Sequence, residues 1–338
     1  MTTKATEFCE EFLLRATRYT SNYGEKKLLA IGSHKFELNC NNKSYFGSLV
    51  FDAFIETKDS NAQGSFSIHV WDSSFPDILP DFTWAEQYIF SNQVIPSEVT
   101  APYRVLFDRG QGMISVLNLE SGQGAIWMRD HSQLDPRCFV SPFRTILSWI
   151  ADTFNAEIVH ASGIDIDGKG ILISGPSGSG KSSLSIFAAQ MGFGIISDDA
   201  VLFEKGILYP IYSRAKVEID NKYISLERLD TFKLANSPSS KRILPLSEFG
   251  NHFVNKVQMH SFLFPHISNK SLIRNLTLNE ASNFLIEHSL RELFGGLPSN
   301  SIRLALILKK YPKYGIELSG DIQADFDLIL KEFINGNN

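Results

Sequence analysis

The stretch Gly175-Pro-Ser-Gly-Ser-Gly-Lys181-Ser182 decides how this chain folds, because it fits the phosphate-binding loop pattern GxxxxGK[ST] at every fixed position. Gly178 and Gly180 let the backbone curl so that several N–H groups point toward a polyphosphate. Lys181 is long enough to reach the β- and γ-phosphates of ATP, and the Ser182 hydroxyl is a ligand for Mg²⁺.

The residues around this stretch have the pattern that such a loop requires. Residues 169–174 are a short apolar run that predicts a buried strand ending at the loop. Residues 182–191 predict a helix, which Gly192 ends and whose positive N-terminus faces the same anion. The predicted nucleotide-binding residues are Gly175, Pro176, Ser177, Gly178, Ser179, Gly180, Lys181, Ser182 and Ser183. The alternative is a glycine-rich surface loop that binds no ligand.

The strand that enters the loop is preceded by a hairpin signal. Asp167-Gly168 stands between two apolar runs, and this dipeptide favours a two-residue turn between antiparallel strands. We therefore expect the strand before the loop to pair antiparallel with the strand that precedes it. An ordinary nucleotide-binding unit of two parallel strands and a helix does not begin this way.

An acidic pair follows the next predicted strand. Residues 193–197 form a short apolar run that ends in Asp198-Asp199. Beside bound phosphates, one carboxylate can hold Mg²⁺ and the other can accept a proton from an attacking hydroxyl. The alternative is a plain turn after a strand, where aspartate is common.

Further elements are predicted beyond the acidic pair. Short strands are expected at 201–203, 207–211 and 216–219, and the last of them contains Glu218. Arg242 is a candidate contact for substrate or phosphate, with a solvated basic turn as the alternative. Thr277 and Glu280 have the spacing of a capping box at the start of a helix over 278–288, and Asp321 is a candidate cap for a helix over 321–333.

Residues 1–140 predict a β-rich mixed domain, and residues 141–338 predict a second, α/β domain that carries the loop. The first domain begins with a helix over 3–19, in which Phe8, Phe12 and Ala16 form an apolar stripe. The second begins with a helix over 142–154. Strands of the first domain are expected at 34–40, 65–71, 103–107, 113–119 and 125–128.

The whole chain has the composition of a globular protein without a nucleic-acid partner. Its 338 residues are enough for two domains, and its net charge of −5 argues against binding to nucleic acid. We see no leader peptide and no apolar run of about 20 residues, so we expect no membrane partner. Cys9, Cys40 and Cys138 are widely spaced, which favours reduced thiols and a cytoplasmic location.

Four features in one order resemble the catalytic domain of HPr kinase/phosphorylase, a bacterial protein-serine kinase. They are the His160-Ala-Ser-Gly segment, the Asp167-Gly168 hairpin, the loop at 175–182 and Ser197-Asp198-Asp199. The chain looks still closer to the HPr-kinase-like enzymes of lasso peptide clusters, which phosphorylate a serine of a ribosomal precursor peptide. The resemblance covers about residues 140–320 and implies a fold related to phosphoenolpyruvate carboxykinase.

The resemblance also implies roles for individual residues. Lys181 and the loop would hold ATP, and Ser182, Asp199 and Glu218 would be the candidates for holding Mg²⁺. Asp198 would be the general base toward the serine hydroxyl, and His160 would lie near the phosphates. The chain departs from the family at Ser183, where an acidic residue is expected, and around Glu218, where a glycine-rich signature is missing. The arginine motif linked to dephosphorylation is not evident either.

Three functions are therefore open at the level of the sequence. The first is an ATP- and Mg²⁺-dependent kinase acting on a serine or threonine of a peptide or protein. The second is a small-molecule kinase, and the third is a nucleotide-binding regulatory module without transfer, which would need no base at Asp198. The N-terminal domain is expected to recruit substrate or to mediate assembly, as a homo-oligomer for example.

Overall fold

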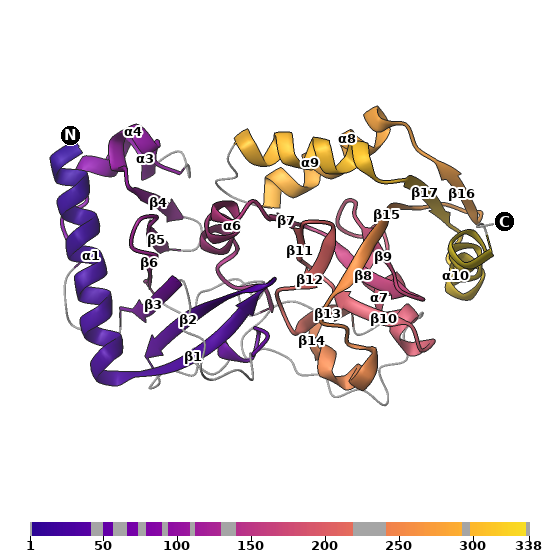
Figure 1. Ribbon diagram of the computed structural model, residues 1–338, viewed down its shortest axis with the longest axis horizontal. Helices are drawn as coiled ribbons and strands as arrows, with labels where there is room; N and C mark the ends of the chain where they lie inside the picture. The colour runs from indigo at the N-terminus through magenta and orange to yellow at the C-terminus, as the bar shows by residue number, and fades with distance from the viewer. Residues whose placement is uncertain are drawn as a thin grey trace. The chain divides into compact units, whose positions relative to one another are not determined.

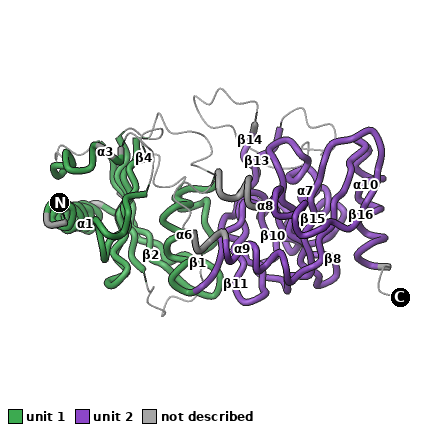
Figure 2. Tube along the Cα trace, turned by 90° about the horizontal axis from the view of Figure 1, so that it is seen from above, with its two compact units in different colours: residues 1–154 green, residues 155–338 purple. Residues whose placement is uncertain are grey.

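The computed structural model describes residues 2–41, 50–56, 66–73, 79–89, 94–108, 112–129, 140–218, 241–292 and 298–335. The chain divides into two compact units, Met1–Phe154 and Asn155–Asn338 (Figure 2). Each unit is built on a sheet with helices beside it, so the protein is of the mixed α/β class (Figure 1). Among the described helices, none is long and apolar enough to cross a membrane.

The first unit has a sheet whose described strands follow the order β1-β2-β3-β6-β5-β4. Both neighbours of β3 are parallel to it, and the other pairs are antiparallel. The strands are β1 (Gly24–Ile31), β2 (His34–Asn41), β3 (Phe66–Asp72), β4 (Tyr103–Asp108), β5 (Met113–Asn118) and β6 (Gln123–Met128). The short helices of this unit are η1 (Thr83–Ala85), α3 (Glu86–Ile89) and α4 (Ser97–Thr100).

Helix α1 (Thr2–Tyr23) covers one face of this sheet. Its predicted stripe of Phe8, Phe12 and Ala16 is buried against strand residues such as Trp71 and Val116. The 3.6-residue period of the sequence explains this packing, because residues four positions apart lie on one side of a helix.

Helix α6 (Arg144–Thr153) belongs to the first unit, whereas the sequence analysis places it at the start of the second. A Cβ atom added to Gly124 of β6 would lie 3.0 Å from Ile146 Cδ1, so the helix packs closely on that strand. Arg104 of β4 also forms an ion pair with Asp152 at 2.9 Å. The units therefore divide after Phe154, not after residue 140, and the helix itself begins after Phe143.

Two cysteines of the first unit are described, and both are buried and unpaired. Cys9 and Cys40 are both free thiols, and Cys138 lies outside the described residues. Burial raises the pKa of the Cys9 thiol to about 12 and also raises the pKa of Cys40. Both therefore stay in the unreactive thiol form at neutral pH.

The second unit has a sheet in the order β10-β8-β9-β15-β12-β11-β7, with β17 beside β15 and β16 beside β17. Its first strands are β7 (Glu157–Val159), β8 (Ser162–Ile166), β9 (Lys169–Ile173), β10 (Gly194–Ser197), β11 (Val201–Glu204) and β12 (Ile207–Pro210). The later ones are β15 (Val257–Ile267), β16 (Leu272–Asn275) and β17 (Lys313–Leu318). A separate hairpin joins β13 (Arg214–Glu218) to β14 (Lys241–Pro245), and η3 (Leu246–His252) follows it.

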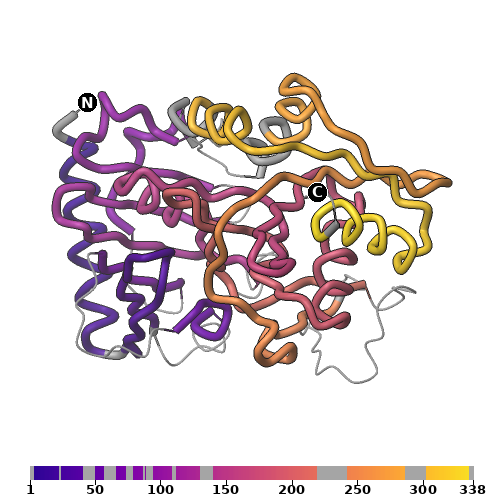
Figure 3. Tube along the Cα trace, turned by 45° about the vertical axis from the view of Figure 1, so that its right-hand side comes forward, coloured from indigo at the N-terminus to yellow at the C-terminus, as the bar shows by residue number. Residues whose placement is uncertain are grey.

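Helices cover both faces of this sheet. Ile171 and Ile173 of β9 face α7 (Lys181–Gln190) and α10 (Ile322–Leu330), whereas Leu172 faces α8 (Leu278–Glu292) and α9 (Pro298–Lys310). Because successive side chains of a strand alternate, a strand covered on both faces is apolar throughout. Helices α7 and α10, far apart in the sequence, lie side by side (Figure 3). The π-helical turn η4 (Lys331–Asn335) follows α10.

The local signals of the sequence appear where they are predicted. Asp167 and Gly168 both have positive φ, 51° and 80°, and join β8 to β9 in an antiparallel hairpin. Thr277 and Glu280 form the capping box, with the Thr277 N–H donating to Glu280 Oε2 at 2.8 Å. Asp321 caps α10 by accepting from the Ala324 N–H at 3.2 Å.

Candidate active site

The loop at 175–180 lies between the buried strand β9 and helix α7, in the order that the sequence predicts. Gly178 and Gly180 have φ values of 81° and 101°, which favour glycine. A Cβ atom at Gly180 would lie only 2.6 Å from Leu318 Cδ1, so a side chain there would have to displace Leu318 as well as adopt a strained φ. The curled backbone and the helix N-terminus are the arrangement that binds phosphate.

Lys181 lies over this loop. Its Nζ donates to the backbone oxygens of Gly175 at 2.8 Å and Pro176 at 2.9 Å, and only 8% of the residue is exposed. The ammonium group is therefore held at the loop by neutral carbonyl oxygens. A phosphate oxygen carries more negative charge than a carbonyl oxygen and makes the stronger hydrogen bond, so a bound polyphosphate is able to take over these contacts.

Ser179 is a buried loop residue whose hydroxyl group makes no hydrogen bond to the described residues. Its Oγ faces the start of the loop, because a Cβ atom added to Gly175 would lie 3.1 Å from it. Leaving a buried hydroxyl without a partner costs about 1–3 kcal/mol, and a phosphate oxygen inside the loop would accept a hydrogen bond from it. The loop therefore fits a polyphosphate.

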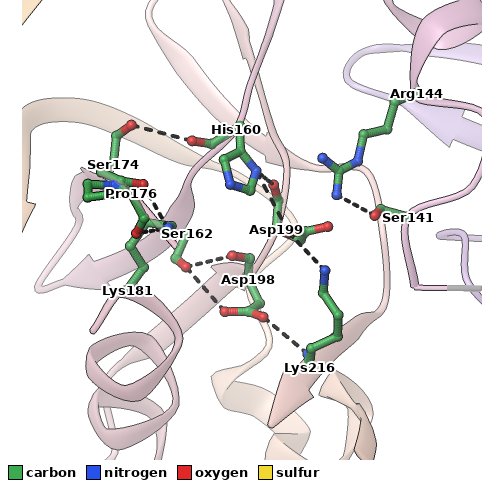
Figure 4. Close-up of polar contacts among 11 residues, drawn as sticks. Ser141, Arg144, His160, Ser162, Ser174, Pro176, Lys181, Asp198, Asp199 and Lys216 are labelled. Carbon is green, nitrogen blue, oxygen red and sulfur yellow. Dashed lines mark hydrogen bonds and ion pairs between the residues drawn. The ribbon is translucent and has the colours of Figure 1, made fainter. Parts of the chain in front are cut away.

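The sheet brings the acidic pair to the same edge as the loop. Strand β8 is antiparallel to both β9 and β10, so the start of β8 meets the ends of the other two. His160 and Ser162 lie at that start, the loop follows β9, and Asp198 and Asp199 follow β10 (Figure 4). Ser174, the first residue after β9, donates its hydroxyl to the His160 backbone oxygen at 3.3 Å.

Asp198 is a buried carboxylate with a fixed orientation. The Ser162 hydroxyl donates to its backbone oxygen at 2.6 Å and lies 3.2 Å from its Oδ1. The backbone N–H of Lys216 donates to its Oδ2 at 3.2 Å. Only 3% of Asp198 is exposed. Its two side-chain oxygens are thus oriented by neutral donors, and an oriented carboxylate is a group that can serve as a general base.

Asp199 lies between two nitrogen groups. His160 Nδ1 donates to the Asp199 backbone oxygen at 2.9 Å, since a carbonyl oxygen can only accept. The same nitrogen is 3.7 Å from Asp199 Oδ1, and the Lys216 ammonium is 3.5 Å from that oxygen. The Lys216 ammonium therefore stands beside Asp199 Oδ1 in a place that a metal cation could take, so Asp199 is the candidate metal ligand of the pair.

Two predicted site residues are placed less centrally. Glu218 is exposed at the end of β13, two positions after Lys216, so both side chains lie on the same face of the strand. Arg242 stands opposite Val217 in the β13–β14 hairpin and so lies on the other face. Within the described ranges, no group of three or more His, Cys, Asp or Glu side chains is close enough to hold a metal.

Lys216 and Ser162 are site residues that the sequence analysis does not single out. Ser162 stands within the His160-Ala-Ser-Gly segment, so the sequence motif that indicates the site includes it without assigning it a role. Lys216 contacts both carboxylates, but it belongs to a hairpin separate from the main sheet. The available signal in the sequence is that Lys216 stands between the apolar residues Ala215 and Val217, which are buried in the structure.

The fold and the site together define a mixed α/β protein with a loop of the phosphate-binding type beside a pair of buried carboxylates. No protein-family model matches the chain, and no curated protein matches it. Among solved structures it is similar to the HPr(Ser) kinase/phosphatase from Coxiella burnetii, with 15% identity over 54% of this chain and 99% of that chain. The TM-score of 0.30 makes this a weak likeness at the level of the fold, without information about a substrate.

Proposed function

We propose that this protein is an ATP- and Mg²⁺-dependent kinase that transfers the γ-phosphate to a serine or threonine hydroxyl of a peptide or protein. The observation that carries the proposal is the position of Asp198. Its buried carboxylate is held by Ser162 and Lys216 at the sheet edge where the loop begins. A module that only binds nucleotide would have no use for an oriented base there.

The chain's residues divide the transfer between them. Lys181 and the loop N–H groups bind and orient the β- and γ-phosphates, and Asp198 accepts the proton of the acceptor hydroxyl. The new bond forms between that oxygen and the γ-phosphorus while the bond to the β-phosphate oxygen breaks, leaving ADP. Because a hydroxyl is a poor nucleophile at neutral pH, the oriented carboxylate contributes about 10²- to 10⁴-fold to the rate.

Ser182 and Asp199 are the residues that would hold Mg²⁺. This ion keeps several waters and binds through one or two carboxylates together with substrate phosphates, so it needs no cluster of three protein ligands. When bound, it neutralises charge on the β- and γ-phosphates. Glu218, exposed at the end of β13, remains a further candidate ligand.

The peptide acceptor comes from the sequence resemblance alone. The likeness to HPr-kinase-like enzymes suggests a protein or a ribosomal precursor peptide of the lasso type as substrate. In that case the first unit would recruit the acceptor. A small-molecule kinase would share the loop and the base, and it is distinguished by phosphorylating a metabolite and no peptide.

The test is to titrate MgATP against the wild type and Lys181→Ala. Losing a charged donor to phosphate should raise the Kd by about 10- to 100-fold. Lys309→Ala, at an exposed position near the end of α9, is the matched control and should leave the Kd unchanged. Equal affinity of the Lys181 variant and the wild type would remove the assignment of the loop.

A further inference from the structure

The two flanks of the phosphate loop differ in chemistry. On one side of β9 lies β8 and then β10, which carry the polar groups His160, Ser162 and Asp198 at their ends. On the other side lies β15 and then β17, which end in Ile267 and Leu318. A polyphosphate bound in the loop therefore has a polar flank and an apolar flank beside it.

Strand β15 runs past the end of β9 along the loop. Its last pairing with β9 joins Leu263 to Ile173, and the Ser174 N–H donates to the Leu263 backbone oxygen at 3.0 Å. From there residues 264–267 pair only with β17 among the described strands, with Ile267 opposite Leu318. Residues opposite each other in neighbouring strands share a face, so these two side chains are neighbours.

Both side chains lie on the side of Gly180 to which a Cβ atom would point. A Cβ atom added to Gly180 would lie 2.6 Å from Leu318 Cδ1 and 3.9 Å from Ile267 Cδ1. Leu318 is 5% exposed, whereas Ile267 is 55% exposed. Ile267 therefore lies beside Gly180 of the loop and presents more than half of its surface to solvent there.

The backbone that carries this apolar pair is firmly held. Asp325, 2% exposed, accepts hydrogen bonds from the Ser271 hydroxyl at 2.5 Å and from the N–H and hydroxyl of Ser319 at 3.0 and 3.1 Å. The Ser268 N–H also donates to the Leu318 backbone oxygen at 2.8 Å. The turns that follow β15 and β17 are thus tied together, and Ile267 is presented on an ordered surface.

We propose that Ile267, supported by Leu318, contacts the nucleoside half of the bound nucleotide; this inference rests on the proposed function. The triphosphate then runs across the loop, with the nucleoside at the apolar flank and the γ-phosphate toward Asp198. Aromatic bases bind against apolar side chains, because contact removes both surfaces from water. Ile267 is an exposed branched side chain beside Gly180 of the loop.

The experiment compares MgATP with magnesium tripolyphosphate, which has the same number of phosphates and no nucleoside. Kd values are measured for the wild type, Ile267→Ala and Ile302→Ala. Ile302 is the matched control, because it is 64% exposed on α9. We expect Ile267→Ala to raise the Kd for MgATP by about five- to tenfold, since part of one side chain's contact is lost. Tripolyphosphate affinity should stay the same, and Ile302→Ala should change neither.

Each other outcome overturns the inference in a recognisable way. Unchanged MgATP affinity in Ile267→Ala places the nucleoside elsewhere. An equal loss for MgATP and tripolyphosphate means that Ile267 only supports the loop. If the wild type binds neither compound, the proposed function itself fails, and the nucleoside contact fails with it. Melting temperatures of the variants show that all of them are folded, which we expect because Ile267 and Ile302 are exposed.

Discussion

Lys216 is the residue that connects the two carboxylates of the site. Its backbone N–H holds Asp198 and its ammonium group lies 3.5 Å from Asp199 Oδ1. One residue thus orients the proposed base and places positive charge on the proposed metal ligand. These two roles can be separated by substitution, because the backbone contact survives a change of side chain.

Lys216→Met should lower the Mg²⁺ concentration that gives half-maximal turnover. The ammonium group competes with a cation for Asp199, and its removal leaves the carboxylate more available. A partly buried ion pair of this kind is worth about 1 kcal/mol, which corresponds to about a fivefold change. Lys216→Arg keeps the charge and should behave as the wild type. If both variants need the same Mg²⁺ as the wild type, Asp199 is not a metal ligand.

The sequence predicts which loop and which acidic pair form this site, but it does not predict the contacts that Lys216 makes with the two carboxylates. The loop and the acidic pair are recognisable because their spacing along the chain is fixed by local chemistry. The Lys216 contacts depend on a hairpin that returns from elsewhere in the fold, so no local pattern contains them. Ser179 is similar, because its unmet hydroxyl becomes visible only when burial is known.

At the scale of single elements, β3 carries a histidine in a chain of hydrogen bonds. The Asn39 amide donates to Ser67 Oγ at 3.1 Å, and Ser67 lies 3.2 Å from His69 Nε2. His69 Nδ1 is 2.6 Å from Thr20 Oγ1, whose hydroxyl donates to the Ala16 backbone oxygen at 3.0 Å. Ser67 can therefore donate to His69 Nε2, and Thr20 Oγ1 can accept from His69 Nδ1. This set of hydrogen bonds fits a neutral imidazole that carries its proton on Nδ1.

This histidine should make stability depend on pH. Burial lowers the pKa of His69 below its ordinary value of about 6.5, and the nearby Glu37 only partly opposes the effect. The unfolded chain therefore binds the proton more readily, so the stabilisation is present above about pH 6.5 and is lost as the pH falls. Between about pH 7.5 and about pH 5.5, the wild type should lose more melting temperature than His69→Gln. Parallel pH profiles of melting temperature for the two proteins would show that protonation of His69 does not affect stability, which would contradict the prediction.

Elements with local signals are predicted, and elements that depend on distant pairing are not. The Asp167-Gly168 turn and the capping box of α8 involve residues within a few positions of one another. No local pattern predicts β15, although this strand is central to its sheet, because it contains Pro265 and its residues do not alternate regularly between apolar and polar. It is stabilised by β9, β12 and β17, all of which are far from it in the sequence.

At the scale of the whole molecule, the two units differ in what they contain. The contacts described for the site all come from the second unit, between His160 and Lys216. The first unit has its own core beneath α1. Its expected roles in recruitment or assembly remain predictions.

A chain that starts at Asn155 should bind MgATP with the affinity of the full-length protein and phosphorylate a peptide acceptor less efficiently. It should also be more soluble than one that starts at Ser141, because α6 would bring the apolar side chains of Ile146 and Ile150 without the sheet on which it packs. Circular dichroism first establishes that each chain is folded. Full efficiency toward the acceptor from Asn155 onward would rule out recruitment by the first unit.

In the proposed reaction Asp198 takes the proton of the acceptor hydroxyl, and the Asp198→Asn variant removes this capacity. The amide keeps the shape of the side chain, and its one oxygen can still accept from the Lys216 N–H, but it cannot accept the proton. The measurements are the Kd for MgATP and the rate of phosphate transfer to a pool of serine-containing peptides. Hydrolysis of ATP is followed in parallel through the release of inorganic phosphate. We predict a Kd within about twofold of the wild type and transfer slower by about two orders of magnitude or more. Undiminished transfer in the Asp198→Asn variant would contradict the account.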